Sequence, residues 1–260
     1  MPFPVELPQT FKAQLADATR PQIGMWISSG SPVNAEIVAS AGFDWLLIDG
    51  EHSPYGLETI CELLRATDAY PANRVVRLPY NDMVLIKQYL DLGAQNLMIP
   101  MVSDAHEAEA AVSAMQYPPR GVRGVGSALA RSSRWNAVPD YLHKAADTIS
   151  LTVQIESATA VENAAEIAVV EGVDAVFVGP SDLAASMGYL GQQTHPEVVE
   201  AVAHTFAAVR AAGKPVGVNA FDPQQAQQYL ADGASFILVG ADVQTLATTA
   251  RALADRFNGS

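Results

Sequence analysis

Two carboxylates, Glu156 and Asp182, each follow an apolar segment that is typical of a buried strand. The segments read TVQIE and AVFVGPSD, and the residues between them have helical character. A strand, a crossover helix and a parallel strand form a βαβ unit, whose neighbouring strands lie about 4.8 Å apart. Carboxylates this close repel each other unless a cation lies between them, and oxygen ligands suit a hard divalent metal. The plainer alternative is that both side chains stabilise helix N-termini.

Further polar residues fall at predicted strand ends. His52 follows Asp49 by three residues, and a carboxylate in that position can orient an imidazole for acid–base chemistry, although a single histidine is more often structural. Arg77 ends the segment NRVVR, and its planar guanidinium suits either a substrate carboxylate or a structural ion pair. The other strand-end candidates are Trp26, Gln154 and Asn219.

The elements that must position these residues alternate between strand and helix. Predicted strands cover residues 24–28, 43–49, 73–78, 96–100, 149–156, 173–178, 215–219 and 236–240. A helix, a glycine and an apolar strand recur at the second, fourth, sixth and eighth strands, as SAGFDWLLID, DLGAQNLMIP, EGVDAVFVGP and DGASFILVGA. Eight alternating units predict a (β/α)₈ TIM barrel. The rival is a doubly wound open sheet, which normally has fewer strands and a Gly-x-Gly-x-x-Gly turn that this chain lacks after its first strand.

Local signals set the boundaries of the predicted helices. Ser53 and Pro54 predict the N-cap and first residue of a helix that reaches about Tyr70. One helix is expected to follow Glu156 and to end near Glu171.

No change in composition marks a linker, so residues 1–260 are predicted to form a single barrel domain. One segment interrupts the alternation, residues 117–136, with the sequence YPPRGVRGVGSALARSSRWN. It holds four of the eleven arginines and is longer than barrel loops need to be. We expect it near the active-site face as a lid or wall, and the alternative is a solvated surface loop.

The composition excludes several functional classes. A net charge of -13 argues against nucleic acid and anionic membrane as partners. The single cysteine, Cys61, excludes an internal disulfide framework and fits a reducing compartment, and neither a signal peptide nor a membrane-length apolar run is evident. A cytoplasmic protein is therefore expected. None of the four lysines falls at a strand carboxyl end, so a Schiff-base mechanism is not expected and carbonyl chemistry would use a metal.

Several motifs together resemble the HpcH/HpaI family of class II, metal-dependent pyruvate aldolases. They are IDGEHSP, VRLPYND, YPPRGVRGVGSALARSSRW, QIES and VFVGPSDLAASMG, and the likeness extends from about Phe11 to Phe257. Within this family, the chain is similar to the 4-hydroxy-2-oxoheptanedioate aldolases and the 2-keto-3-deoxy sugar-acid aldolases. The resemblance implies a (β/α)₈ barrel that exchanges its eighth helix between subunits and assembles as a hexamer, a trimer of dimers.

The resemblance also implies roles for individual residues. Glu156 and Asp182 correspond to metal ligands, Arg77 to the residue that steadies the pyruvate oxygen, and His52 with Asp49 to the catalytic base. A larger set is implied for substrate binding: Trp26, Gln154, Asn219, the main-chain N–H groups of Ser181 and Asp182, and Asp91 reaching a neighbouring subunit's site. Asn219 stands where an apolar residue is expected in the heptanedioate enzymes, which leaves the acceptor preference open.

The expected reaction is reversible cleavage of a 4-hydroxy-2-oxo acid to pyruvate and an aldehyde through a pyruvate enolate. All-oxygen ligands favour Mg²⁺ or Mn²⁺, with Co²⁺, Ni²⁺ and Zn²⁺ as alternatives. Two other functions stay open. One is a malyl- or citryl-type acyl-CoA lyase, for which residues 117–136 are the only candidate nucleotide groove, and the other is a non-catalytic 2-oxo-acid binding protein.

Overall fold

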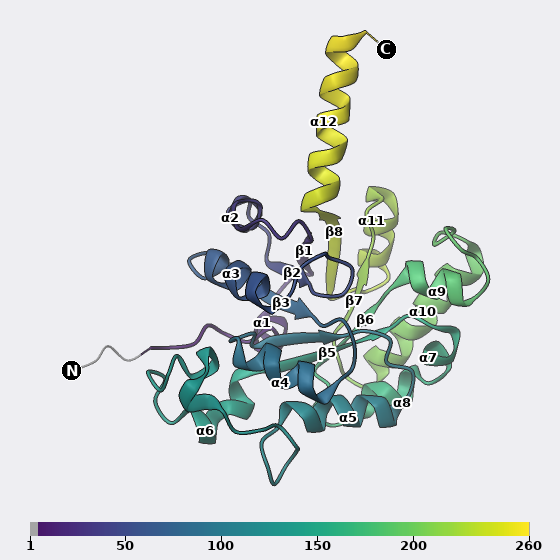
Figure 1. The fold of residues 1–260 in the computed structure, drawn as a ribbon. Coiled ribbons are helices and arrows are strands. Elements are labelled where there is room, and N and C mark those ends of the chain that lie inside the picture. Colours follow the sequence, from purple (N-terminus) through teal and green to yellow (C-terminus); the bar gives the residue numbers. More distant parts are fainter. Residues whose placement is uncertain (1–4, 260) are drawn as a thin grey trace.

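The computed structural model describes residues 5–259, which form a closed barrel of parallel strands (Figure 1). Each strand pairs with the next in the chain, and the last pairs with the first, which confirms the predicted (β/α)₈ architecture. The strands are β1 (Gln22–Ile27), β2 (Trp45–Asp49), β3 (Asn73–Arg77), β4 (Asn96–Ile99), β5 (Ser150–Ile155), β6 (Ala175–Val178), β7 (Val216–Asn219) and β8 (Phe236–Ala241).

Between consecutive strands, helices return the chain from the carboxyl end of one strand to the amino end of the next, while α1 precedes β1 and α12 follows β8. They are α1 (Phe11–Asp17), α2 (Pro32–Ala39), α3 (Leu57–Thr67), α4 (Met83–Asp91), α5 (Ala105–Met115), α6 (Tyr141–Lys144), α7 (Ala158–Glu162), α8 (Ala164–Val169), α9 (Pro180–Ser186), α10 (Pro196–Ala211), α11 (Pro223–Ala231) and α12 (Asp242–Asn258). Most of them surround the barrel, whereas α12 extends away from it (Figure 1). Within the described range, no helix is both long and apolar enough to span a membrane.

The recurring glycines have a backbone reason. Gly42, Gly93, Gly172 and Gly233 precede β2, β4, β6 and β8 with φ angles of 95°, 91°, 98° and 101°. This left-handed conformation ends a helix and is readily adopted by a residue without Cβ. The repeat seen in the sequence therefore marks the same helix-to-strand turn at four places.

Two predicted helix boundaries are wrong. α3 begins at Leu57 with Gly56 as its N-cap, rather than at Ser53 and Pro54. Tyr55 explains the delay, because its hydroxyl donates to the carbonyl of Ile27 in β1 (2.9 Å) and holds residues 50–55 in a turn against the barrel. The helix expected after β5 is split into α7 and α8 at Asn163, whose side chain donates to the carbonyl of Ser103 (2.8 Å).

Aromatic side chains close the amino-terminal end of the barrel. Phe11 from α1 contacts Trp45 and Phe236, with ring centroids 5.1 and 5.3 Å apart, and Phe177 completes the group. Gly24 and Gly217 give these rings space, since a Cβ at either position would overlap Trp45 or Phe236. The interior is a packed core at this end, so chemistry inside the barrel is expected at its carboxyl end.

We expect Phe236→Ala to lower the free energy of unfolding by about 3–5 kcal/mol, because the ring is fully buried and the cavity left behind cannot collapse onto rigid strands. Urea denaturation followed by circular dichroism measures this. Leu190→Ala, which removes a side chain that is 80% exposed, is the control and should change stability by less than about 0.5 kcal/mol. Equal effects of the two substitutions would contradict the role given to the aromatic plug.

Candidate active site

A cavity of about 330 Å³ lies at the carboxyl ends of the strands, and we call it the main cavity. Its lining includes every predicted site residue except Asp91. These are Trp26, Asp49, His52, Arg77, Gln154, Glu156, Ser181, Asp182 and Asn219, contributed by six of the eight strands or the loops that follow them. The parallel closed sheet explains the gathering, because all strand carboxyl ends lie at one end of a barrel.

Arg77 is fixed by two carboxylates. Register places Asp49 of β2 beside Arg77 of β3, and both Nε and Nη2 of the arginine lie 2.9 Å from Asp49 Oδ1. Nη1 lies 3.0 Å from Oε2 of Glu51. Glu51 was missed in the sequence, although its position between Gly50 and His52 in the IDGEH motif was a usable signal. One hydrogen bond, from Nε to Asp49 Oδ1, and two ion-pair contacts thus hold the guanidinium. Nη1 and Nη2 each carry two N–H groups, so donors remain for a ligand.

An indole and an amide complete the support of Arg77. The guanidinium carbon of Arg77 lies 4.4 Å from the centre of a ring of Trp26, a cation–π contact. Trp26 Nε1 in turn donates to Oδ1 of Asn219 (2.8 Å). β1, β3 and β7 are therefore linked through one stack of side chains beneath the cavity.

Glu156 is a buried carboxylate with an excess of negative charge around it. It is 3% exposed, and it accepts hydrogen bonds from the Met101 main-chain N–H (2.8 Å) and from Gln154 Nε2 (3.0 Å). Burial is the main cause that raises the pKa of Glu156 to about 7, and the charges of Asp182 and Glu51 add to the shift. Gly179 makes room for this carboxylate, because a Cβ there would overlap Glu156 Oε2.

His52 lies at the rim of the main cavity, with 65% of its side chain exposed. The Asp49 carboxylate contacts Arg77 and accepts from the main-chain N–H groups of Glu51 (3.0 Å) and His52 (3.5 Å). The carboxylate nearest the imidazole is that of Glu51, with Nε2 and Oε1 4.0 Å apart. Asp49 thus positions the backbone that carries His52, while its contact with the ring itself stays a prediction.

Asp91 is the one predicted site residue that does not line the main cavity. It is the last residue of α4 and forms an ion pair with Arg123 (3.0 Å), whose side chain is fully buried. A helix that returns from a strand ends at the amino-terminal side of the barrel, away from the main cavity of its own subunit. The expectation that Asp91 reaches a neighbouring subunit's site remains a prediction.

Residues 117–136 do not lie at the active-site face of their own barrel, contrary to our expectation. Arg131 forms an ion pair with Asp68 after α3, and Arg134 lines a small pocket with Asn73 and Asn96, the first residues of β3 and β4. The segment follows α5, whose last residue is already at the amino-terminal end. Its arginines therefore find carboxylates there, and in this chain they supply no basic groove beside the main cavity.

The residues of the main cavity fit a divalent cation. Glu156 and Asp182 supply oxygen ligands, and Oε1 of the buried Gln154 has no hydrogen-bond partner in the described chain. Arg77 is the arginine beside Asp49, Glu51 and Glu156, and the charge of Asp182 adds to the repulsion among these carboxylates. A bound cation would relieve that repulsion. Between residues 5 and 259, no three His, Cys, Asp or Glu side chains gather closely enough to hold a metal by themselves. Glu156 and Asp182 would therefore hold the cation together with ligands from outside the chain.

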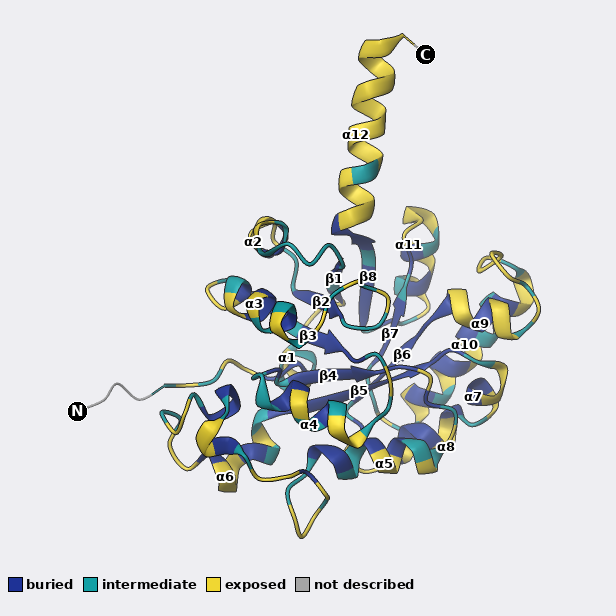
Figure 2. Cartoon of the chain, viewed as in Figure 1, coloured by how far each residue is buried: buried dark blue, intermediate teal, exposed yellow. Residues whose placement is uncertain are grey.

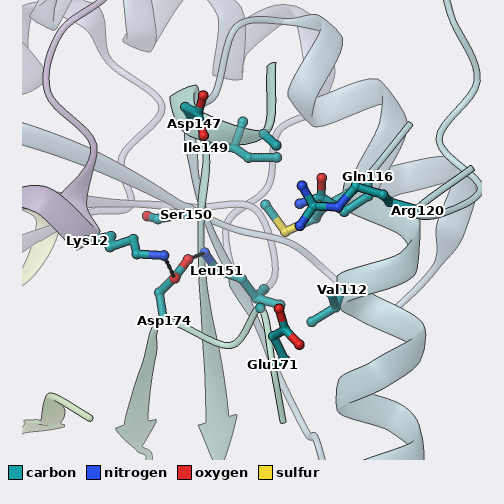
Figure 3. Close-up of a pocket in the computed structure, with 13 residues that line it drawn as sticks. Lys12, Val112, Gln116, Arg120, Asp147, Ile149, Ser150, Leu151, Glu171 and Asp174 are labelled. Atoms are coloured by element: carbon teal, nitrogen blue, oxygen red, sulfur yellow. Dashed lines mark hydrogen bonds and ion pairs between the residues drawn. The ribbon is translucent and has the colours of Figure 1, made fainter. Parts of the chain in front are cut away.

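A larger cavity of about 480 Å³ lies at the opposite end of the barrel, next to the first residues of β5 (Figure 3). Its charged groups are partly engaged within the chain: Lys12 contacts Asp174 (2.7 Å), which also accepts from the Leu151 N–H (2.9 Å). Arg120 lines this cavity too, in agreement with the position of residues 117–136. Because it is at the amino ends of the strands, we do not assign chemistry to it.

Comparison with known proteins identifies the family. The family described as HpcH/HpaI aldolase/citrate lyase matches residues 22–249. The chain belongs to this family. A 4-hydroxy-2-oxo-heptane-1,7-dioate aldolase from Shigella sonnei (strain Ss046) is 53% identical over 248 residues, which cover 95% of this chain and 94% of that protein. The protein of the same name from Escherichia coli is 52% identical with the same coverage.

Solved structures agree with this membership. A family protein from Burkholderia cenocepacia J2315 has a TM-score of 0.91 and 40% identity, covering 95% of this chain and 98% of that one. An HpcH/HpaI aldolase from Desulfitobacterium hafniense DCB-2 has a TM-score of 0.86 and 31% identity, covering 95% and 96%. The predicted family and the predicted enzyme class, a carbon–carbon lyase of the aldolase type, are confirmed.

The raised pKa of Glu156 predicts a pH effect on the metal-free protein. Since the folded pKa lies above the ordinary value of about 4.3, its contribution favours folding below pH 4.3 and is lost as the pH rises to about 7. In EDTA, the melting temperature of the parent should fall relative to that of Glu156→Gln between pH 5 and pH 8, by about 5 °C. Differential scanning calorimetry of both proteins measures this difference in melting temperature. Glu166→Gln, at an exposed position of α8, is the control. Parallel curves for parent and Glu156→Gln would show that Glu156 is ionised throughout.

Proposed function

We propose that this protein is a metal-dependent class II aldolase that reversibly cleaves 4-hydroxy-2-oxo acids to pyruvate and an aldehyde. The observation that carries the proposal is the buried Glu156 beside Asp182, which forms no ion pair with any residue between 5 and 259, in a cavity that also holds Arg77 and His52. The similarity to proteins named 4-hydroxy-2-oxo-heptane-1,7-dioate aldolase supports it.

The chain's own groups bind the 2-oxo acid in the main cavity. Ser181 and Asp182 lie in the first turn of α9, where main-chain N–H groups lack helical partners and can receive the carboxylate. Arg77 presents terminal N–H groups to the 2-oxo oxygen, on which negative charge develops as the pyruvate enolate forms. Gln154 borders this group, and Trp26 keeps the guanidinium in place.

Glu156 and Asp182 would hold a divalent cation, which would supply Lewis-acid polarisation of the 2-oxo group. Oxygen ligands favour Mg²⁺ or Mn²⁺, with Co²⁺, Ni²⁺ or Zn²⁺ as substitutes. In cleavage, His52 accepts the proton of the C4 hydroxyl, the C3–C4 bond breaks, and its electron pair passes into the enolate. In the reverse direction His52 returns that proton to the aldehyde oxygen. Asp49 holds the His52 main chain and Arg77 for both steps.

The acyl-CoA lyase alternative loses its main support. It needs a basic groove for the nucleotide, and the arginines of residues 117–136 lie at the other end of their own barrel. The binding-protein alternative is separated from an aldolase by the test that follows. We also propose a cytoplasmic location, which the single cysteine favours.

The test follows pyruvate release from 4-hydroxy-2-oxo acids, together with exchange of the pyruvate methyl protons in D₂O by NMR. EDTA should abolish both activities, and Mg²⁺, Mn²⁺ or Co²⁺ should restore them. His52→Ala should lower pyruvate release by about 10²–10⁴-fold while metal and pyruvate still bind, because it removes the general base. His204→Ala, an exposed histidine of α10, is the control. Turnover that persists in EDTA would refute the metal roles of Glu156 and Asp182, and an unchanged rate in His52→Ala would refute the base.

We further propose that α12 packs on a second copy of the chain, in an exchange that builds the hexamer. α12 stands away from the barrel and is exposed along nearly its whole length (Figure 2). Its apolar residues Val243, Leu246, Leu253 and Phe257 follow helical spacing on one side, and an isolated helix of this length is marginally stable in water. Val33 and Ile37 of α2 are likewise apolar and over 60% exposed, next to an apolar groove of about 280 Å³ along α12.

Replacing Leu246 and Leu253 by Asp should therefore dissociate the assembly, because two charges would enter an apolar contact. Light scattering after gel filtration should give a multiple of the 27.6 kDa chain mass for the parent and a smaller multiple for the variant. Thr248→Asp, on the opposite side of α12, is the control and should keep the parent mass. A parent that is already monomeric would refute the exchange.

A further inference from the structure

A second cavity of about 250 Å³ adjoins the main cavity, and we call it the side hollow. It lies between the connection from α9 to α10 and the first turns of α11. Pro180, Ser181, Asn219 and Phe221 line both cavities, so they are adjacent chambers with a shared wall. A molecule whose one end occupies the main cavity can therefore extend into the side hollow.

The lining of the side hollow mixes apolar side chains with uncharged polar ones and carries little charge. Its hydrogen-bonding side chains are the hydroxyls of Ser181 and Thr194 and the amides of Gln193, Asn219 and Gln225. Asp222 is the one charged residue among the described residues that line it, and its Oδ1 accepts from the Gln225 N–H as the N-cap of α11 (2.8 Å). Hydroxyls and amides both donate and accept, which matches the hydroxyl groups of a ligand.

Several of these groups have unused hydrogen-bonding capacity. The indole N–H of Trp26 can only donate, so its partner on Asn219 must be the amide oxygen, and Asn219 Nδ2 is left without a partner in the described chain. The hydroxyl of Tyr229, which also lines the hollow, is buried and has no partner in the same part of the chain. A buried hydroxyl without a partner, such as that of Tyr229, is unfavourable until a ligand pairs with it.

Among the described residues of one subunit, a second carboxylate on the substrate would find no unpaired cation in the side hollow. The named substrate of the 53% identical relative is a dioate, whose cleavage to pyruvate leaves a four-carbon aldehyde that carries a carboxylate. Among the described residues lining the two cavities, the only cationic candidates are Arg77, which already pairs with Asp49 and Glu51, and His52 at the rim. In the side hollow, Asp222 would repel an anionic group instead.

We propose that the side hollow binds the aldehyde portion of the substrate, and that it selects an uncharged, hydroxylated short-chain aldehyde over a carboxylated one. The inference rests on the proposed aldolase function and names its acceptor. The reaction balances without a co-reactant: pyruvate loses a methyl proton, its C3 bonds to the aldehyde carbon, and the aldehyde oxygen gains a proton. Each hydroxyl of the acceptor then forms a hydrogen bond with the side-chain amide of Asn219 or Gln225 or with a neighbouring polar group.

The experiment measures kcat/KM for the acceptor in aldol addition to pyruvate, with full-length, metal-loaded protein. The acceptors are glyceraldehyde, propanal, which lacks the hydroxyls, and 4-oxobutanoate, which carries a carboxylate. The parent should favour glyceraldehyde over both. Asn219→Leu and Gln225→Leu should each lower the ratio of glyceraldehyde to propanal by about fivefold to tenfold, as expected for one lost hydrogen bond. Because the intrinsic reactivity of each aldehyde cancels, the change in this ratio reports on the side hollow.

Two further variants sharpen the result. Gln227→Leu, the same change on the outward side of α11, should keep the parent ratio. Gln225→Arg places a cation at the hollow and should raise kcat/KM for 4-oxobutanoate at least tenfold. A parent that prefers 4-oxobutanoate, or ratios that do not change in Asn219→Leu and Gln225→Leu, would overturn the inference.

Deuterium exchange into the pyruvate methyl group needs no acceptor, so it separates this inference from the function on which it rests. Exchange without addition to any of the three aldehydes would overturn the side hollow as the acceptor subsite and leave the proposed aldolase chemistry standing. The absence of exchange in the metal-loaded parent would overturn both.

Discussion

Four carboxylates and one arginine, placed close together in a partly buried cavity, are the constraint on which the rest of this site depends. Asp49 and Glu51 fix Arg77, whereas Glu156 has hydrogen bonds from Met101 and Gln154 but no ion pair within the part of the chain that the structure describes. The local charge is therefore unbalanced. Burial raises the pKa of Glu156, and the charges of Asp182 and Glu51 raise it further. An environment of this kind is unfavourable for folding alone but suitable for a divalent cation and an anionic 2-oxo acid.

The barrel tolerates this imbalance because the rest of its core is apolar, both between the sheet and the helices and inside the barrel. Phe11, Trp45, Phe177 and Phe236 fill the amino-terminal half of the interior, and the sheet register fixes the backbone around them. Trp26 stands at the boundary, with its ring against Arg77 and its N–H bonded to Asn219. The same two contacts that hold the arginine also set the amide orientation of Asn219, so the main cavity and the side hollow are coupled through one indole.

The proposed exchange of α12 would supply what a single barrel leaves incomplete. α12 covers little of its own barrel and shows an apolar stripe, while apolar residues of α2 remain exposed beside it (Figure 2). Residues 117–136 and Asp91 lie at the amino-terminal end, away from their own main cavity. Under the proposed exchange of α12, residues distant from the site in one subunit can approach the site of another, which is the role predicted for Asp91.

The sequence by itself determined the barrel and most of the site. Strand periodicity, the four left-handed glycines and the polar residues at strand carboxyl ends are local features, and parallel strands in a closed sheet necessarily bring those ends together. Tertiary structure decided the rest. The partners of Asp49, the inclusion of Glu51, the late start of α3 at Leu57, the break at Asn163 and the side of the barrel that residues 117–136 occupy all depend on contacts between residues far apart in the chain, such as Tyr55 with Ile27 and Arg131 with Asp68. The side hollow belongs to the same class, because only the packing of α11 against the connection after α9 creates a space whose lining can be compared with a substrate.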